Sequence, residues 1–210
     1  IGEEVGLALD FHGRVSPAFA PTLVRALEPF SPLFFEEPML PLVVERLAFL
    51  KKLTHIPIAF GERLYSRWDF HPYLDAGVVD VIQPDPSHAG GITECRKIAT
   101  MAETYGALVA FHCPLGPIAL AACVQLAAVT HNFLVQETSL GIHYNEGLEL
   151  TDYLLNPEVF ALDQGFVQLP RAPGLGVQID EEVVREAAHT ARKDWFNPIW
   201  RSDDGSVAEW

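Results

Sequence analysis

Six ionisable side chains recur along this chain at intervals of about 25 residues, and each one closes a short apolar run. They are Asp10, Glu36, Glu62, Asp85, His112 and Glu137. Such an interval accommodates one strand, one helix and two short loops, so the pattern predicts a ring of side chains at one face of a βα barrel. That face is where barrel enzymes perform their chemistry.

Three successive strand ends carry carboxylates, namely Asp10, Glu36 and Glu62. Like charges in close proximity cannot all stay ionised unless protons or a divalent cation lie among them. An all-oxygen ligand set suits Mg²⁺, whereas zinc would require His or Cys. Alternatively, these acids could pair with Arg14 and Arg63, but their shared position in three consecutive units favours a magnesium site.

Asp85 and His112 close the next two strands, so we expect them to be neighbours. An aspartate that holds one imidazole nitrogen fixes the tautomer and raises the pKa, which leaves the other nitrogen as a general base. His12 lies two residues beyond Asp10 and should share its face because strand side chains alternate. It is either an acid opposite the base or a histidine at the rim. Glu137, if protonated, could donate to an enolate oxygen; otherwise it bonds a neighbouring strand.

A metal with a base on one side and an acid on the other can remove a proton next to a carboxylate. The cation stabilises the resulting ene-diolate, and the acid helps a β-hydroxyl to leave. The residues therefore indicate proton abstraction next to a carboxylate as the reaction class.

Short apolar runs separated by helical patterns position these side chains. Strands are predicted at residues 5–10, 33–36, 56–60, 78–83, 107–111 and 133–136, and helices at 16–27, 42–53, 68–76, 92–105 and 117–130. Apolar strands without alternation indicate burial on both faces, as in parallel sheets covered by helices. The predicted fold is α/β, a partial TIM-type barrel over residues 1–160 with six of the eight strands of a closed barrel.

Residues 161–210 are predicted to form a separate C-terminal segment, irregular where glycine and proline are frequent. Ser16 and Asp180 are predicted helix N-caps, and the helix after Asp180 should end near Ala191. The segment is expected to dock on the barrel or on a capping domain through Trp195, Trp200 and Trp210, the alternative being a flexible tail.

The amino-acid composition argues against some classes of binding partner. The formal net charge is −14, from 14 basic and 28 acidic residues, which argues against nucleic acid and anionic membranes. Three cysteines without CxxC spacing favour a reduced, cytoplasmic setting. No uncharged apolar stretch reaches the roughly 18 residues that a membrane helix requires.

Several motifs together resemble the mandelate racemase branch of the enolase superfamily. They are Asp10-Phe-His-Gly-Arg14, Phe35-Glu-Glu-Pro38, Gly61-Glu-Arg63, Gln83-Pro-Asp85, Ser87-His-Ala-Gly-Gly-Ile-Thr-Glu94, His112-Cys-Pro-Leu-Gly-Pro117, Gly141-Ile-His-Tyr-Asn145 and the terminus from Trp200. A His or Lys base beside Mg²⁺ is the pattern of that superfamily.

The resemblance implies dehydration of a six-carbon sugar acid to a 2-keto-3-deoxy acid. It implies Mg²⁺ on Asp10, Glu36 and Glu62 and a symmetric homo-oligomer. It also implies a role for each catalytic residue: His112 with Asp85 as the base at C2, His12 as the acid that expels the 3-hydroxyl, and Glu137 as the group that stabilises the intermediate.

Alternatives stay open at this point. A racemase or epimerase would use the same metal and base, and a non-catalytic barrel relic would use neither. Members of the superfamily carry an N-terminal capping domain and two further barrel strands ahead of the strand that ends in Asp10. Because the chain opens with Ile1, almost directly in a strand, we expect it to be part of a longer protein and to be inactive or unstable alone.

Overall fold

The computed structural model describes residues 4–141, 149–190 and 201, and its centre is a parallel sheet. Five strands follow one another in chain order across this sheet. They are β1 (Leu9–Asp10), β2 (Phe35–Glu36), β3 (Ile58–Phe60), β4 (Val81–Ile82) and β5 (Leu108–Val109). This order confirms the α/β prediction, since parallel neighbours joined by helices are the repeating unit of a barrel.

The sixth predicted strand is present only as a bridge. Phe133 pairs with Val109 in parallel, and Val109 N donates to Asn132 O while Leu134 N donates to Val109 O, each over 2.8 Å. The regular strands are also shorter than predicted, because the ladders extend over only two or three residues at each position. The structure is therefore a partial barrel of five strands with a sixth segment at its edge.

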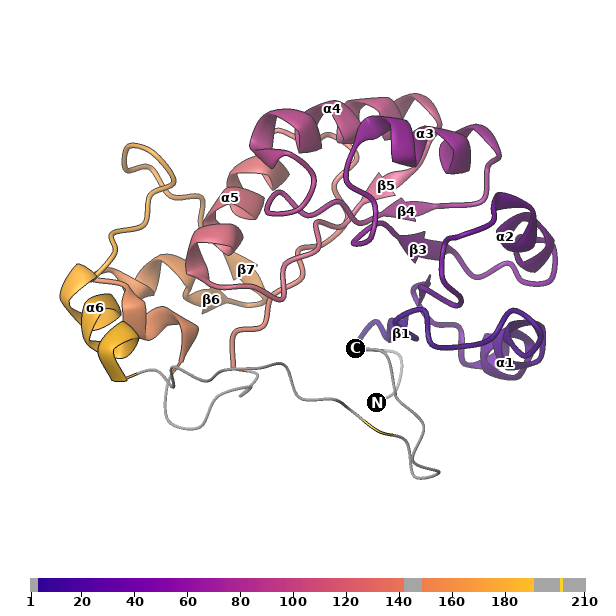
Figure 1. Ribbon diagram of the computed structural model, residues 1–210, viewed down its shortest axis with the longest axis horizontal. Helices are drawn as coiled ribbons and strands as arrows, with labels where there is room; N and C mark the ends of the chain where they lie inside the picture. The colour runs from indigo at the N-terminus through magenta and orange to yellow at the C-terminus, as the bar shows by residue number, and fades with distance from the viewer. Residues whose placement is uncertain (1–3, 142–148, 191–200, 202–210) are drawn as a thin grey trace.

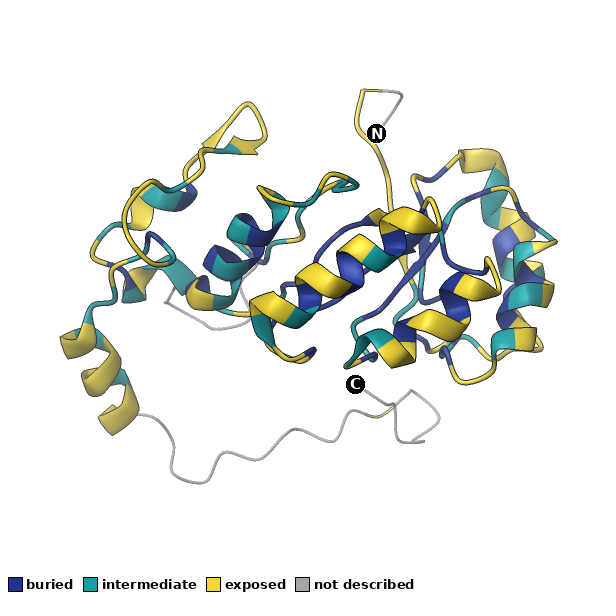
Figure 2. Ribbon diagram, turned by 90° about the horizontal axis from the view of Figure 1, so that it is seen from above, coloured by how far each residue is buried: buried dark blue, intermediate teal, exposed yellow. Residues whose placement is uncertain are grey.

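Helices lie along the outer side of the curved sheet (Figure 1). They are α1 (Ala20–Leu27), α2 (Val44–Lys51), α3 (Arg67–Asp75), α4 (Gly91–Thr104) and α5 (Pro117–Ala127). Figure 2 shows buried residues on one side of these helices and exposed residues on the other. In α4 the buried stripe is Cys95, Ile98, Ala99 and Ala102, which is the helical spacing expected of an amphipathic helix.

The predicted N-cap of the first helix is wrong. The helix begins at Ala20 with Phe19 at the cap position, and no side chain caps it. Ser16 instead uses its backbone carbonyl, which accepts bonds from the N–H groups of Phe19 and Ala20 at 2.9 and 3.0 Å. Ser16 and Pro17 thus form a turn that precedes the helix.

Both faces of the sheet are buried, as the apolar runs predicted. One face contributes Phe35, Ile58, Phe60, Ile82 and Val109 to the large core beneath the helices. The alternate residues Phe34, Ala59, Val81 and Ala110 form a second cluster on the opposite face, with Leu134 packed against it. Since strand side chains alternate between faces, this second cluster is the interior of the partial barrel.

The C-terminal segment contains more regular structure than predicted. Strands β6 (Leu162–Asp163) and β7 (Phe166–Val167) form an antiparallel hairpin. Its two-residue turn, Gln164 and Gly165, has φ values of 51° and 86°, as a type I′ turn requires. The expectation of an irregular stretch misses this hairpin because it treats Gly165 as a breaker rather than as a turn residue.

Helix α6 (Glu181–Thr190) begins where it was predicted, because Asp180 Oδ1 accepts the N–H groups of Glu182 and Val183, each over 3.1 Å. It packs against the 3₁₀ helix Leu150–Tyr153, which lies against α5. The predicted division at residue 160 stays a prediction. The tryptophan tail, the predicted helix end at Ala191 and most of the motif at 141–145 lie outside the described residues. Within the described residues, no helix combines the length and apolarity needed to cross a membrane.

Candidate active site

Asp85 and His112 are neighbours, as their equivalent strand ends predicted. Nδ1 of His112 lies 2.8 Å from Oδ2 of Asp85, and both residues are buried. The other Asp85 oxygen accepts the backbone N–H of Ser87 over 2.6 Å, which holds the carboxylate in place. A carboxylate held in this way fixes which imidazole nitrogen of His112 carries the proton.

The electrostatics of this pair raise the basicity of the histidine. Burial lowers the pKa of His112, but the hydrogen bond to Asp85 and the charges of Glu137 and Glu62 outweigh burial, so the pKa is raised. Burial raises the pKa of Asp85, but the hydrogen bonds from His112 and Ser87 outweigh it, so the pKa is lowered. His112 therefore has the basicity of a proton acceptor.

Glu62 lies between two histidines. Its Oε2 is 3.4 Å from Nε2 of His112, and its Oε1 is 3.3 Å from Nε2 of His12. Arg63 also approaches Oε1 through Nη2, at 3.3 Å. Two imidazole nitrogens therefore face a common carboxylate from its two oxygens, which is the layout expected of a base and an acid on opposite sides of one centre.

Strand alternation does not account for the direction of His12, so that part of the prediction is wrong, although the residue does lie in the ring beside Glu62. Strand β1 ends at Asp10, and alternation does not extend to His12. His12 lies in the following turn with a left-handed φ of 52°, and its N–H donates to Asp10 Oδ1 over 2.6 Å. A side-chain acceptor two residues back supports this turn and directs the imidazole toward Glu62.

The carboxylates at the first strand ends repel one another. Asp10 and Glu36 are direct partners in the β1–β2 register. Burial raises the pKa of Glu36 to about 8; a hydrogen bond from Gln83 opposes this, and the charges of Asp10, Glu137 and Glu62 add to it. Burial likewise raises the pKa of Glu62, against the lowering effect of His112 and Arg63.

The carboxylates of Asp10, Glu36 and Glu62 fit a hard divalent cation by their chemistry. They are all-oxygen donors, and the charges of Asp10 and Glu62 add to the burial that raises the pKa of Glu36. Their oxygen atoms are not all gathered within 4.8 Å of one another. These residues therefore provide suitable ligand atoms for a divalent cation, but they do not form a closed coordination sphere.

Glu137 lies at the end of the sixth segment, where the residue is exposed. Its Oε2 accepts the N–H of Cys113 over 2.8 Å. That bond joins the edge segment to the strand end that carries His112. Glu137 also contributes charge at His112, Glu36 and Glu62, so it belongs to the same cluster.

The fully buried Glu37 is a member of the site that sequence reasoning missed. Its Oε2 accepts Arg63 Nε over 2.9 Å, and Arg63 also reaches the backbone carbonyl of His12 at 3.4 Å. Burial raises the pKa of Glu37, and the neighbouring Arg63 opposes this rise. Two consecutive acids at one strand end are the signal in the sequence that could have identified it.

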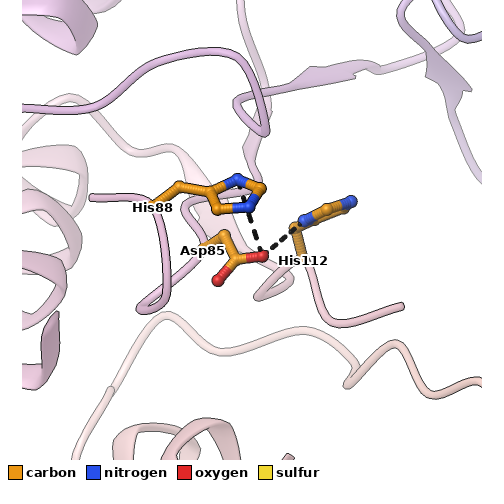
Figure 3. Close-up of side chains that lie close together, drawn as sticks. All are labelled: Asp85, His88 and His112. Atoms are coloured by element: carbon orange, nitrogen blue, oxygen red, sulfur yellow. Dashed lines mark hydrogen bonds and ion pairs between the residues drawn. The ribbon is translucent and has the colours of Figure 1, made fainter. Parts of the chain in front are cut away.

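His88 was also missed. Its Nδ1 lies 3.8 Å from Oδ2 of Asp85, and its ring is 5.9 Å from that of His112 (Figure 3). Asp85, His88 and His112 are the only group of three or more His, Cys, Asp and Glu within the described residues whose ligand atoms all lie within 4.8 Å of one another. The sequence places His88 in a family motif but assigns it no role, because it does not close a strand.

Comparison with known proteins defines the class. Residues 1–183 match the family described as "Enolase C-terminal domain-like". The chain therefore belongs to this family, whose barrel-type fold agrees with the parallel sheet and the ring of strand-end residues.

The curated relatives it matches include D-galactonate dehydratase from Ralstonia nicotianae, 57% identical over 209 residues, which is all of this chain and 54% of that protein. D-galactonate dehydratase from Variovorax paradoxus is 54% identical over 206 residues, or 98% of this chain and 54% of that protein. The chain thus spans about half the length of the curated relatives it matches.

Solved structures show the same fold. An enolase from Agrobacterium radiobacter, bound to sodium and L-malate, matches with a TM-score of 0.83 and 34% identity over 97% of this chain and 53% of that one. A mandelate racemase/muconate lactonizing enzyme-like protein from Rubrobacter xylanophilus matches with a TM-score of 0.79 and 32% identity over 88% of this chain and 46% of that one.

Proposed function

We propose that this chain forms the catalytic barrel of a Mg²⁺-dependent sugar-acid dehydratase that converts D-galactonate to 2-keto-3-deoxy-D-galactonate. The observation that carries the proposal is the pair of histidine Nε2 atoms that face the two oxygens of Glu62, with His112 held by Asp85. The relatives named D-galactonate dehydratase support the choice of substrate.

Asp10, Glu36 and Glu62 would hold the magnesium ion. When bound, Mg²⁺ supplies positive charge that stabilises the negative charge developing at the substrate carboxylate. The mutual repulsion of these residues, which contributes to the raised pKa of Glu36, would be relieved at the same time.

The protein side chains then move two protons. Nε2 of His112 takes the proton from C2, while Asp85 accepts the Nδ1–H and stabilises the imidazolium that forms. His12, in its protonated form, gives a proton to the 3-hydroxyl, which leaves as water. The electron pair of the C2–H bond forms the new C2=C3 double bond, and the enol product tautomerises to the keto acid. Glu137, if protonated, donates a hydrogen bond to the developing enolate oxygen.

The proposed reaction also indicates where the protein works and what it binds. The substrate is a small sugar acid, and we infer that the protein works in the cytoplasm as a homo-oligomer without nucleic acid or membrane partners. The acidic composition and the three buried, unpaired cysteines support this inference.

Two variants of the full-length protein test the proposal. Each is assayed with D-galactonate and Mg²⁺ in D₂O. His112→Asn should lower keto-acid formation by about 100-fold or more and stop deuterium incorporation at C2, because the base is lost. His12→Asn should also lower keto-acid formation, but it should still allow deuterium exchange in recovered substrate, because only the acid is lost.

His131→Asn is the matched control, since His131 is highly exposed and lies away from the ring, 3.8 Å from Glu103. It should leave both readouts unchanged. Keto-acid formation by His112→Asn within tenfold of the native rate would disprove the proposed base. Deuterium incorporation with inversion at C2 and without keto acid in the native protein would favour a racemase or epimerase.

A further inference from the structure

A tight turn after β4 brings a second histidine back over the aspartate that holds His112. The backbone carbonyl of Asp85 accepts the N–H groups of His88 and Ala89 at 3.1 and 2.7 Å. Residues three apart in such a turn lie on the same side, so the His88 ring lies over the Asp85 carboxylate (Figure 3).

We propose that Asp85, His88 and His112 form a binding site for a zinc-class divalent cation, distinct from the carboxylate site for Mg²⁺. Two imidazoles and one carboxylate are a borderline-soft ligand set that Zn²⁺ prefers and that Mg²⁺ does not. The proposed site does not depend on the proposed activity, because it requires only the three side chains.

The distances are suitable for zinc. Ligands at zinc distances in a tetrahedron lie about 3.4 Å apart. The two ligand pairs that share Asp85 Oδ2 bracket this value, at 2.8 Å for His112 Nδ1 and 3.8 Å for His88 Nδ1. Because the three ligand atoms all lie within 4.8 Å of one another, side-chain rotations that change these separations by at most about 1.4 Å would close the site.

The surroundings of the cluster provide both rigidity and access. Asp85 is buried, and its Oδ1 is held by the Ser87 N–H, which leaves Oδ2 to face both imidazoles. The side chain of His88 is 40% exposed, against 10% for His112, so an ion can enter from the His88 side. An outer hydrogen bond that orients a ligand carboxylate is a regular feature of zinc sites.

Binding requires the other tautomer of His112. The proton that Nδ1 shares with Asp85 is released to solvent while Nε2 takes one up, so the imidazole stays neutral, and a nitrogen–zinc bond forms at Nδ1 with no change of oxidation state. The ion would then occupy the nitrogen through which Asp85 orients His112. Zinc binding should therefore remove the hydrogen bond by which Asp85 orients His112.

Isothermal titration calorimetry of the full-length protein with Zn²⁺, in saturating Mg²⁺, tests the site. We expect one zinc ion per chain that His88→Ala weakens by at least about tenfold, since even outer-shell changes cost that much in metal sites. Co²⁺ in place of Zn²⁺ should give the strong visible absorption of a tetrahedral complex, which the variant should lose.

His131→Ala is the control and should bind Zn²⁺ as the native protein does, because His131 lies outside the cluster. Unchanged zinc affinity in His88→Ala would overturn the proposal, as would zinc binding that Glu36→Gln abolishes while His88→Ala spares it. Native protein without zinc binding would overturn it too. Each of these outcomes leaves the dehydratase proposal intact, because that proposal is tested by product formation.

Discussion

Crowded negative charge is the dominant feature at the scale of single residues. Asp10, Glu36, Glu62 and Glu137 act on one another electrostatically, and Arg63, His12 and His112 all contact Glu62. Arg63 accounts for part of the alternative in which arginines neutralise strand-end acids, since it contacts Glu62 and Glu37. No arginine of the described residues forms an ion pair with Glu36, and burial raises the pKa of Glu36 to about 8.

The raised pKa of Glu36 predicts how stability depends on pH without divalent cations. The folded pKa of about 8 lies above the ordinary value of 4.5, so between these values the folded protein binds a proton that the unfolded chain has lost. Stability should fall as pH rises through this window, by at most about 1.4 kcal/mol per pH unit for one proton. Glu36→Gln should flatten this fall.

Urea denaturation in EDTA at about pH 5 and about pH 8.5 measures this effect. Glu103→Gln, a change at an exposed glutamate, is the control and should keep the native pH dependence. The interpretation fails if Glu36→Gln loses as much stability over this interval as the native protein. Addition of Mg²⁺ should stabilise the native protein at the higher pH more than it stabilises Glu36→Gln.

The ends of the strands position the residues of the site. The spacing between neighbouring strand ends depends on close backbone contact. Gly61 lies between β3 and Glu62, directly against the end of β4. A Cβ atom at this position would lie 2.6, 2.8 and 2.9 Å from the N, C and O atoms of Gln83. Since these are backbone atoms, no side-chain rotation relieves the contact. The two strands, and with them Glu62 and Asp85, can keep their separation only if residue 61 lacks a side chain.

Gly61→Ala should therefore destabilise the protein by about 1–3 kcal/mol, because the ends of β3 and β4 must move apart. The shift should also weaken Mg²⁺ binding, since Glu62 follows directly. Gly116→Ala is the matched control: nothing lies within 4 Å of the place that a Cβ atom would take there, and its φ of −69° suits alanine. Equal denaturation midpoints for the two variants would show that the contact at Gly61 is readily accommodated.

At the scale of the whole molecule, the sheet has two open edges among the described residues. β1 pairs only with β2, and the segment at Phe133 pairs only with β5. Unpaired edges with apolar side chains are sites of association between chains. Relatives about twice as long contain further sequence, and in such a protein additional strands would cover these edges.

Residues 1–210 expressed alone should consequently self-associate, and Val135→Lys should reduce this association. Val135 is an exposed apolar residue on the edge segment, where a lysine would oppose pairing with another strand. Sedimentation velocity over a range of concentrations measures the effect. Leu42→Lys is the control, because Leu42 is exposed in the turn before α2 and away from both edges. A monomeric native chain, or equal effects of the two lysines, would contradict the prediction.

The local sequence pattern determined which elements form and the order in which the strands lie in the sheet. The period of the apolar runs predicted the parallel α/β sheet and the order of its strands. Asp10 and Glu36 end their strands as predicted, whereas Glu62, Asp85 and His112 lie two or three residues past the ends of theirs. These features follow from nearest-neighbour geometry, because consecutive βα units are adjacent and their strands end on one side. The capping role of Asp180 was predicted for the same local reason.

Only the tertiary structure decided how side chains from different units meet. The left-handed turn at His12 directs its ring to Glu62, Arg63 joins the buried Glu37 to the backbone of His12, and the turn after β4 brings His88 over Asp85. None of these contacts has a sequence period, since each joins loops whose direction depends on backbone conformation and packing. Strand spacing is set by repeating backbone hydrogen bonds, whereas the direction of a loop side chain is set by its particular neighbours.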